Sequence, residues 1–278
     1  MDIANRIMVV TGGASGIGKA LAEALHREGA RHVVVADLDE AGAKEVAETI
    51  GGTGVGLDVA DEGAVRDLVA ATQANIGPID LFMSNAGYVT IGGLEVPNKE
   101  INDMWDVHVM SHVYAARAVL PSMIDRGEGY IMSTASAAGL LTQLGSLAYS
   151  LTKHAAVALA EWIAVTHGHQ GIRVSVHCPQ AVRTNIGANS PNPRRRDALS
   201  VGVASGDGVL TSEQAADACI EAVRAERFWV LPHPEVAEYV RRKATDIDRW
   251  LHGMRRFQGR LYEGRQLPGD WFTDSQGD

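Results

Sequence analysis

Seven short apolar runs alternate with segments of helical periodicity, and this alternation constrains the fold of the 278-residue chain more than any other feature. The runs are rich in Val, Ile and Leu and nearly continuous, as expected for strands that are buried on both faces of a sheet. Strands that alternate with helices are typical of βαβ units and a parallel sheet. The runs lie at about 6–11, 32–37, 54–59, 80–87, 129–136, 172–179 and 227–232.

Helical patterns fill the intervals between these runs, at about 17–28, 40–50, 61–75, 99–125, 148–168 and 212–225. A further pattern at 235–262 places apolar residues at helical spacing and predicts an extra C-terminal amphipathic helix, weakened by Gly253 and Gly259. The sequence therefore predicts an α/β fold with a doubly wound, seven-stranded parallel sheet and helices on both faces. We find no internal repeat.

A glycine-rich turn, "VTGGASGIGKA" at 10–20, joins the first strand to the first helix. Glycines let the backbone turn tightly and approach a pyrophosphate, and the helix that follows presents unpaired N–H groups and the positive end of its dipole. Asp37 ends the second strand about twenty residues later, where a carboxylate accepts hydrogen bonds from the adenosine ribose. That carboxylate would repel a 2′-phosphate, so a Rossmann-type site for NAD, rather than NADP, is predicted.

Tyr149 and Lys153 lie four residues apart in a predicted helix and so share one of its faces. A free tyrosine has a pKa of about 10 and is a poor base at neutral pH. A neighbouring ammonium favours the phenolate, as does an oxidised nicotinamide. Tyr149 could then take the proton of an alcohol while hydride passes to NAD. The alternative interpretation is an ordinary surface pair.

Together, TGGASGIG (11–18), LDV (57–59), SNAG (84–87), Ser136, the Tyr149–Lys153 segment and CPQAVRT (178–184) resemble the short-chain dehydrogenase/reductase family over residues 5–232. The resemblance implies that Ser136 hydrogen-bonds to the substrate oxygen and that Lys153 also binds the nicotinamide ribose. It further implies a set of cofactor-binding residues: Gly12, Ser15, Ile17 and Gly18 in the turn, Asp58 and Val59 at the adenine, Asn85, Ala86 and Gly87 beside the central sheet, and Pro179, Val182 and Thr184 at the nicotinamide.

His108 departs from the family pattern, because it stands where the family usually has a fourth catalytic residue, an asparagine that acts through a helix kink and a backbone carbonyl. A histidine titrates near neutral pH and could join a proton relay or position its neighbours. Simple packing of His108 is the alternative. Gln180 replaces a common glycine at the end of a predicted strand, where ligands bind in open α/β sheets. We expect its amide to face the substrate, with packing as the alternative.

The substrate is expected between Ser136, Tyr149 and a long irregular loop at 185–211, which resembles a lid. Ala138 and Gln143 are expected in the pocket wall, and because most neighbouring residues are small or apolar we predict a hydrophobic secondary alcohol or ketone. Arg194, Arg195 and Arg196 in the loop could pair with a substrate anion, although a solvated basic run is the commoner case. No metal site is expected.

Two parts are expected, a dinucleotide-binding and catalytic domain at 1–232 and a helical extension at 233–278. The extension carries eight Lys or Arg residues between 241 and 265 in a chain of net charge −9. Its apolar stripe favours docking on its own body or on a neighbouring subunit over binding to nucleic acid or lipid. The resemblance implies a homotetramer or homodimer. Two cysteines and the absence of a signal peptide or an apolar span predict a cytoplasmic protein that binds no membrane. The net negative charge argues against nucleic-acid binding.

The leading functional prediction is an NAD-dependent oxidoreductase. Epimerases and dehydratases of the same family are a second possibility, because they share this scaffold. A non-catalytic NAD sensor is a third, which His108 would allow and the intact Ser136, Tyr149 and Lys153 disfavour.

Overall fold

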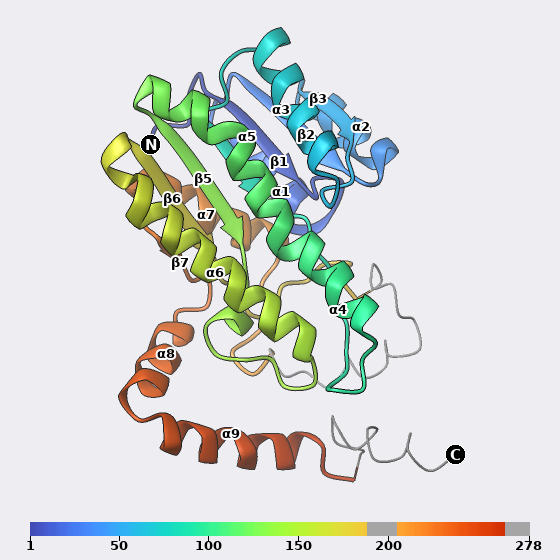
Figure 1. Ribbon diagram of the computed structural model, residues 1–278, viewed down its shortest axis with the longest axis vertical. Helices are drawn as coiled ribbons and strands as arrows, with labels where there is room; N and C mark the ends of the chain where they lie inside the picture. Colours follow the sequence, from blue (N-terminus) through green and yellow to red (C-terminus); the bar gives the residue numbers. More distant parts are fainter. Residues whose placement is uncertain (188–204, 265–278) are drawn as a thin grey trace.

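A seven-stranded, wholly parallel sheet in the order β3-β2-β1-β4-β5-β6-β7 forms the centre of the molecule in a computed structural model (Figure 1). The structure describes residues 1–187 and 205–264. The expected loop at 185–211 is thus described only at its two ends, and Arg194, Arg195 and Arg196 lie outside the described residues. The strands are β1 (Ile7–Thr11), β2 (His32–Asp37), β3 (Thr53–Gly56), β4 (Leu81–Ser84), β5 (Gly129–Thr134), β6 (Ile172–His177) and β7 (Trp229–Val230).

Helices cover both faces of the sheet, which confirms the predicted doubly wound fold (Figure 1). One face is covered by helices α1, α2 and α7, and the other by helices α3, α5 and α6. Their bounds lie within a few residues of the expected ones: α1 (Gly16–Arg27), α2 (Glu40–Thr49), α3 (Glu62–Asn75), α4 (Asn98–Trp105), η1 (Asp106–Met110), α5 (Ser111–Arg126), α6 (Leu147–His167) and α7 (Ser212–Ala225).

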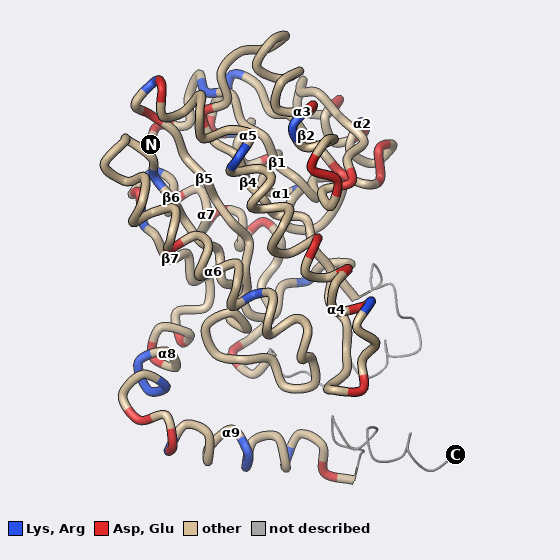
Figure 2. Tube along the Cα trace, viewed as in Figure 1, with Lys and Arg blue, Asp and Glu red and all other residues tan. Residues whose placement is uncertain are grey.

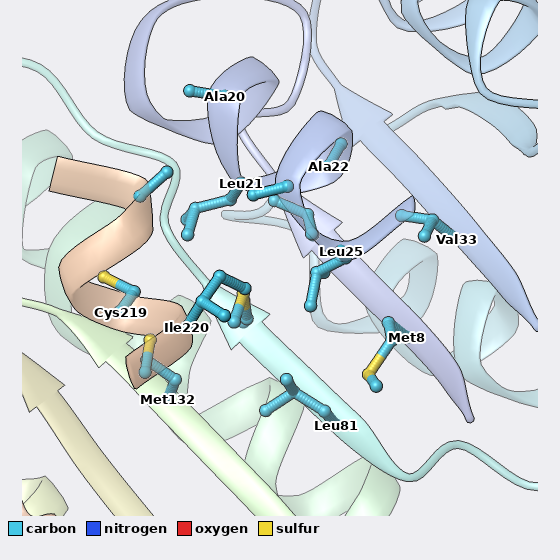
Figure 3. Packing of buried hydrophobic residues seen from close by; sticks show 14 of the residues in the cluster. Met8, Ala20, Leu21, Ala22, Leu25, Val33, Leu81, Met132, Cys219 and Ile220 are labelled. Carbon is cyan, nitrogen blue, oxygen red and sulfur yellow. The ribbon is translucent and has the colours of Figure 1, made fainter. Parts of the chain in front are cut away.

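Two apolar cores follow from the alternation of side chains along each strand. Met8 and Leu81 point to the face of α1 and α7, where they pack with Leu25, Cys219 and Ile220 (Figure 3). Their neighbours Val9 and Phe82 point to the opposite face, under α3, α5 and α6. Strands buried on both sides explain the continuous apolar runs in the sequence.

The C-terminal helix is present, but it is broken into two: α8 (Glu235–Thr245) and α9 (Ile247–Leu261). The break falls at Asp246, which is extended and caps α9 through its side chain, rather than at Gly253 or Gly259. We call residues 235–261 the C-terminal arm. It leaves the body beyond β7, and α9 then runs below the end of the sheet to which β5 points (Figure 1).

Charged residues of both signs are spread over the body and the arm, with acidic residues gathered around α2 and α3 (Figure 2). α9 buries none of its residues and packs chiefly on α8. Side-chain hydrogen bonds tie α8 to the body: Lys243 donates to the Leu140 carbonyl, and Tyr239 donates to Asp207. Among the described helices, none is long and apolar enough to span a bilayer.

Candidate active site

A cavity of about 1530 Å³ opens at the carboxyl ends of the central strands, where the strand order reverses between β1 and β4. Ligands of open α/β sheets bind at this switch point. The cavity joins the glycine turn after β1 to Ser136, Tyr149 and Lys153, and its outer wall comes from the C-terminal arm. All of the sequence-predicted site residues border it except His108, which lies directly behind the wall.

The glycine turn is shaped to receive an anion. Gly12 and Gly16 have φ angles of +66° and +53°, which favour glycine, and a Cβ at Gly18 would overlap the Gly12 carbonyl. α1 begins at Gly16 with no side-chain cap and no acidic residue in its first turn. Its first N–H groups therefore remain free to bind a pyrophosphate, so the turn fits a dinucleotide.

Asp37 is fixed at the edge of this turn. Its Oδ2 accepts a hydrogen bond from the Ala14 amide at 3.0 Å, and its Oδ1 accepts one from the Asp39 amide at 3.0 Å. Asp58 and Val59 border the same groove after β3, with the Asp58 side chain accepting from the Ala60 amide at 2.9 Å. The groove thus presents a carboxylate where the adenosine ribose of a dinucleotide would lie.

Asn85 ties together the ends of three strands next to the groove. Its Nδ2 donates to the Thr11 carbonyl at 3.1 Å, and its Oδ1 accepts from the Thr134 hydroxyl at 3.1 Å. The Asn85 and Ala86 amides donate to Thr11 Oγ1. At Gly87 a Cβ would lie 3.0 Å from His108 Nε2, so a larger residue here would press on the imidazole. These contacts hold the floor of the cavity in place.

Ser136 and Tyr149 meet at the centre of the cavity. The Ser136 hydroxyl donates to the Pro179 carbonyl at 3.3 Å and accepts from the Ala138 amide at 3.1 Å, which begins a short helical turn at Ala137–Gly139. Tyr149 lies in the first turn of α6 and remains partly exposed to the cavity. Burial raises the pKa of Tyr149 above its ordinary value, and a hydrogen bond with Ser136 offsets part of that rise.

Lys153 is a buried ammonium, only 3% exposed, one turn beyond Tyr149 on α6. Its Nζ donates to the Thr134 carbonyl at 3.0 Å and lies 5.5 Å from the centroid of the Tyr149 ring. No carboxylate of the described residues pairs with it, and burial lowers its pKa to about 8. Buried charges without a counter-ion are expensive and concentrate at functional sites.

His108 lies within a π-helical turn, η1, that interrupts the long helix formed by α4 and α5. Its side chain is fully buried: Nε2 accepts from the Tyr88 amide at 3.1 Å, and Nδ1 faces Thr152 Oγ1 at 3.0 Å. Because Thr152 donates its own proton to the Ala148 carbonyl at 2.9 Å, Nδ1 carries the proton of the imidazole. Burial, reinforced by the charge of Lys153, lowers the pKa of His108 well below 6.5.

Both nitrogens of a neutral His108 are therefore engaged, which favours a positioning role over a proton relay. We expect His108→Asn to keep kcat/KM within about tenfold, a change near 1.4 kcal/mol in the barrier, because an amide can also accept from Tyr88. His108→Leu leaves that buried amide unpaired and should lower the free energy of unfolding by about 1–3 kcal/mol. Steady-state kinetics and denaturant unfolding measure the two effects. A pH–rate step that disappears in His108→Asn would contradict the positioning role.

The remaining predicted residues line the substrate end of the cavity. Ala138, Gln143, Pro179, Gln180, Val182 and Thr184 all border it. The Gln180 side chain, expected to face the substrate, donates from Nε2 to Asp207 Oδ2 at 2.8 Å. Whether its carbonyl oxygen also contacts substrate stays a prediction. Within the described residues, no group of three or more His, Cys, Asp or Glu side chains could hold a metal ion.

Sequence reasoning missed the outer wall of the cavity. Tyr239, Trp250, Met254 and Phe257 of the arm border it, together with Asp207 and Tyr262. The helical pattern at 235–262 was visible in the sequence, and its apolar stripe signalled a contact. Nothing in the pattern indicated that this contact would be the cavity.

Comparison with known proteins gives a consistent result. The model of the family described as short chain dehydrogenase matches residues 6–195. The 1-deoxy-11-beta-hydroxypentalenate dehydrogenase of Streptomyces avermitilis is 32% identical over 253 residues, which cover 88% of this chain and 90% of the relative. A CLA biosynthesis dehydrogenase/reductase of Lactiplantibacillus plantarum is 30% identical, with 88% of this chain and 95% of that protein covered.

A solved structure has the same architecture. The short chain dehydrogenase/reductase from Burkholderia phymatum, crystallised in complex with NAD, superposes with a TM-score of 0.81 at 29% sequence identity. The superposition covers 89% of this chain and 96% of that one.

Proposed function

Because the chain belongs to the short-chain dehydrogenase/reductase family, we propose that it is an NAD-dependent oxidoreductase that interconverts a hydrophobic secondary alcohol and its ketone. The observation that carries the proposal is the convergence of Ser136, Tyr149 and Lys153 on one cavity that is continuous with the glycine turn. Members of this family use NAD(H) or NADP(H), and Asp37 at the edge of the groove favours NAD.

The cofactor residues divide the dinucleotide between them. The turn at Gly12–Gly18 would hold the pyrophosphate, Asp37 the adenosine ribose, Asp58 and Val59 the adenine, and Val182 and Thr184 the nicotinamide. When bound, NAD supplies the hydride acceptor. The groove and the reactive residues share one cavity, so an alcohol bound next to Tyr149 would lie within reach of the nicotinamide of NAD.

Tyr149 acts as the general base in alcohol oxidation and as the general acid in ketone reduction. Burial raises the pKa of Tyr149 above its ordinary value, so ionisation of the phenol near neutral pH requires positive charge nearby. The Lys153 ammonium, 5.5 Å from the ring centroid, supplies part of that charge. At pH 7, below its pKa of about 8, Lys153 is mostly protonated. Ser136, buried beside Pro179, holds the substrate oxygen by a hydrogen bond.

The substrate end of the cavity supports a hydrophobic substrate. Tyr88, Val89, Ile91, Leu141 and Leu144 line it on the side of the body, and Trp250, Met254 and Phe257 line it on the side of the arm. Burial of an alicyclic or long-chain alcohol against these side chains is favourable in proportion to the area that it covers. The name of the Streptomyces avermitilis relative, a hydroxypentalenate dehydrogenase, agrees with a hydroxylated substrate.

A screen of secondary alcohols and ketones with NAD and NADP in parallel tests the proposal, with reduced nicotinamide followed by its absorbance. Turnover with NAD and a lipophilic secondary alcohol is the expected result. An epimerase or dehydratase would change the substrate without net accumulation of reduced nicotinamide. An NAD sensor would bind the dinucleotide and leave every substrate unchanged.

We also propose that the protein is a homodimer or homotetramer that associates through the outer face of α6. Members of the family are commonly oligomeric, and Trp162 and Val165 on this face are 59% and 84% exposed in a single chain. Large exposed apolar residues that cluster on one helix are typical of an interface.

Trp162→Arg should lower the mass in light scattering to that of a smaller assembly, because it places a charge at the centre of this face. Leu94→Arg is the matched control, since Leu94 is an exposed leucine, 75% accessible, in the loop before α4. An unchanged mass for Trp162→Arg would exclude α6 as the interface.

A further inference from the structure

Three side chains from separate segments form a continuous hydrogen-bond network at the outer wall of the cavity. Gln180, after β6, donates from Nε2 to Asp207 Oδ2 at 2.8 Å. Tyr239, on α8, donates from its hydroxyl to Asp207 Oδ1 at 2.9 Å. Both carboxylate oxygens of Asp207 therefore have a partner, and hydrogen bonds to a charged group are stronger than neutral ones. All three residues border the cavity.

The inner end of the network lies next to the reactive serine. Gln180 directly follows Pro179, whose carbonyl accepts the Ser136 hydroxyl. The backbone N–H of Gln180 donates to Nδ1 of the buried His233 at 3.2 Å. The main chain of Gln180 is therefore held as well as its side chain. Gln180 is thus held at two points, directly beside the place where the substrate oxygen would bind.

The outer end of the network reaches the helix that covers the cavity. The Tyr239 ring packs against Trp250 of α9, with ring centroids 6.5 Å apart. Trp250, Met254 and Phe257 line the cavity, whereas α9 buries none of its residues and packs chiefly on α8. The position of this apolar wall therefore depends on how firmly α8 is tied to the body.

We propose that Gln180, Asp207 and Tyr239 are positioning residues that hold the C-terminal arm against the substrate end of the cavity, and that they thereby determine specificity for bulky alcohols. A small alcohol contacts Ser136 and Tyr149 alone and does not need the arm. A bulky apolar alcohol extends to Trp250, Met254 and Phe257, and its affinity depends on their staying in place. The effect on specificity rests on the proposed function, and the effect on the arm does not.

Four variants distinguish the effect of the hydrogen-bond network from that of other contacts of the arm. Tyr239→Phe removes one donor and keeps the ring. Gln180→Glu brings two carboxylates together. The double variant Gln180→Glu/Asp207→Asn restores a donor–acceptor pair, since the new amide can donate to the glutamate and still accept from Tyr239. Arg241→Met is the matched control, because it breaks an exposed ion pair with Glu238 on the same helix and leaves the network untouched.

Hydrogen exchange measures the arm without any need for activity. In Tyr239→Phe and Gln180→Glu, the amides of 247–261 should exchange about tenfold faster, as expected for the loss of a hydrogen bond to a charged group. Exchange in α7 should not change. The double variant and Arg241→Met should match the unmodified protein. Unchanged exchange in α9 for both single variants, or failure of the double variant to restore it, would overturn the proposal.

Kinetics with 2-butanol and 2-decalol measure the specificity. For 2-decalol, KM should rise about tenfold in Tyr239→Phe while kcat stays within about twofold. For 2-butanol, Tyr239→Phe should leave KM within about twofold, and Arg241→Met should leave KM unchanged for both alcohols. Equal losses on both alcohols would overturn the role in specificity. If the unmodified protein oxidised no alcohol, the proposed function would fail, whereas the exchange experiment would still decide whether the network holds the arm.

Discussion

Tyr149→Phe should lower kcat by about 10²- to 10⁴-fold and leave the affinity for NAD within about twofold, because general acid–base catalysis contributes that much and phenylalanine has no proton to exchange. The ring itself should stay in place. It packs edge-on against His108 with centroids 5.7 Å apart, and that contact does not involve the hydroxyl. Steady-state kinetics with a lipophilic secondary alcohol, together with calorimetric titration of NAD, measure both quantities.

Tyr114→Phe is the matched control, since Tyr114 lies on α5 away from the cavity and should tolerate the change without loss of rate. If Tyr149→Phe kept full turnover, Tyr149 would not be the acid–base residue. If the unmodified protein bound NAD and turned over no substrate, the sensor would be the better interpretation. Retained NAD binding together with lost turnover is the outcome that only the enzyme explains.

The fold could be predicted from the sequence because each strand, turn and helix of a doubly wound sheet depends mainly on the residues within it. Met8 and Val9 sit on opposite faces of β1, and both faces are covered, so the strand is apolar throughout. A turn such as Gly12–Gly18 also depends on its own residues, because the positive φ angles of Gly12 and Gly16 favour glycine. Tyr149 and Lys153 belong to a single helix, and their separation fixes their relative placement.

Other features depend on partners distant in the chain, and a single sequence does not specify which partner is chosen. The sequence indicated the importance of His108, but not that Tyr88 and Thr152 would occupy both of its nitrogens. Gln180 was singled out at the right strand end, yet its bond to Asp207 depends on how the loop after β6 folds back. The pKa of Tyr149 could not be predicted from nearby residues either, because burial by the whole fold raises it more than the hydrogen bond with Ser136 lowers it.

Reversal of the cofactor preference should be the second large effect, with Asp37→Ser/Leu38→Arg shifting the NADP/NAD ratio of kcat/KM by about a thousandfold or more. Two unit charges about 4 Å apart near a protein surface interact by about 4 kcal/mol, and each 1.4 kcal/mol is a factor of ten. Asp37 cannot turn away from a 2′-phosphate, because the Ala14 and Asp39 amides hold its two oxygens. Kinetics with each cofactor and one alcohol give the ratio.

The two substitutions act in different ways, one by removing a repulsion and the other by adding a cation, so the single variants test each effect separately. Asp37→Ser removes the repulsion and should provide most of the shift. Leu38→Arg adds a cation at a side chain that is 78% exposed, where a new charge can be accommodated with little loss of stability. With Asp37 still present, however, the new arginine would pair with the carboxylate as readily as with a phosphate, so Leu38→Arg alone should gain little. An unchanged ratio in Asp37→Ser would mean that the carboxylate does not face the ribose, and the preference for NAD would then need another source.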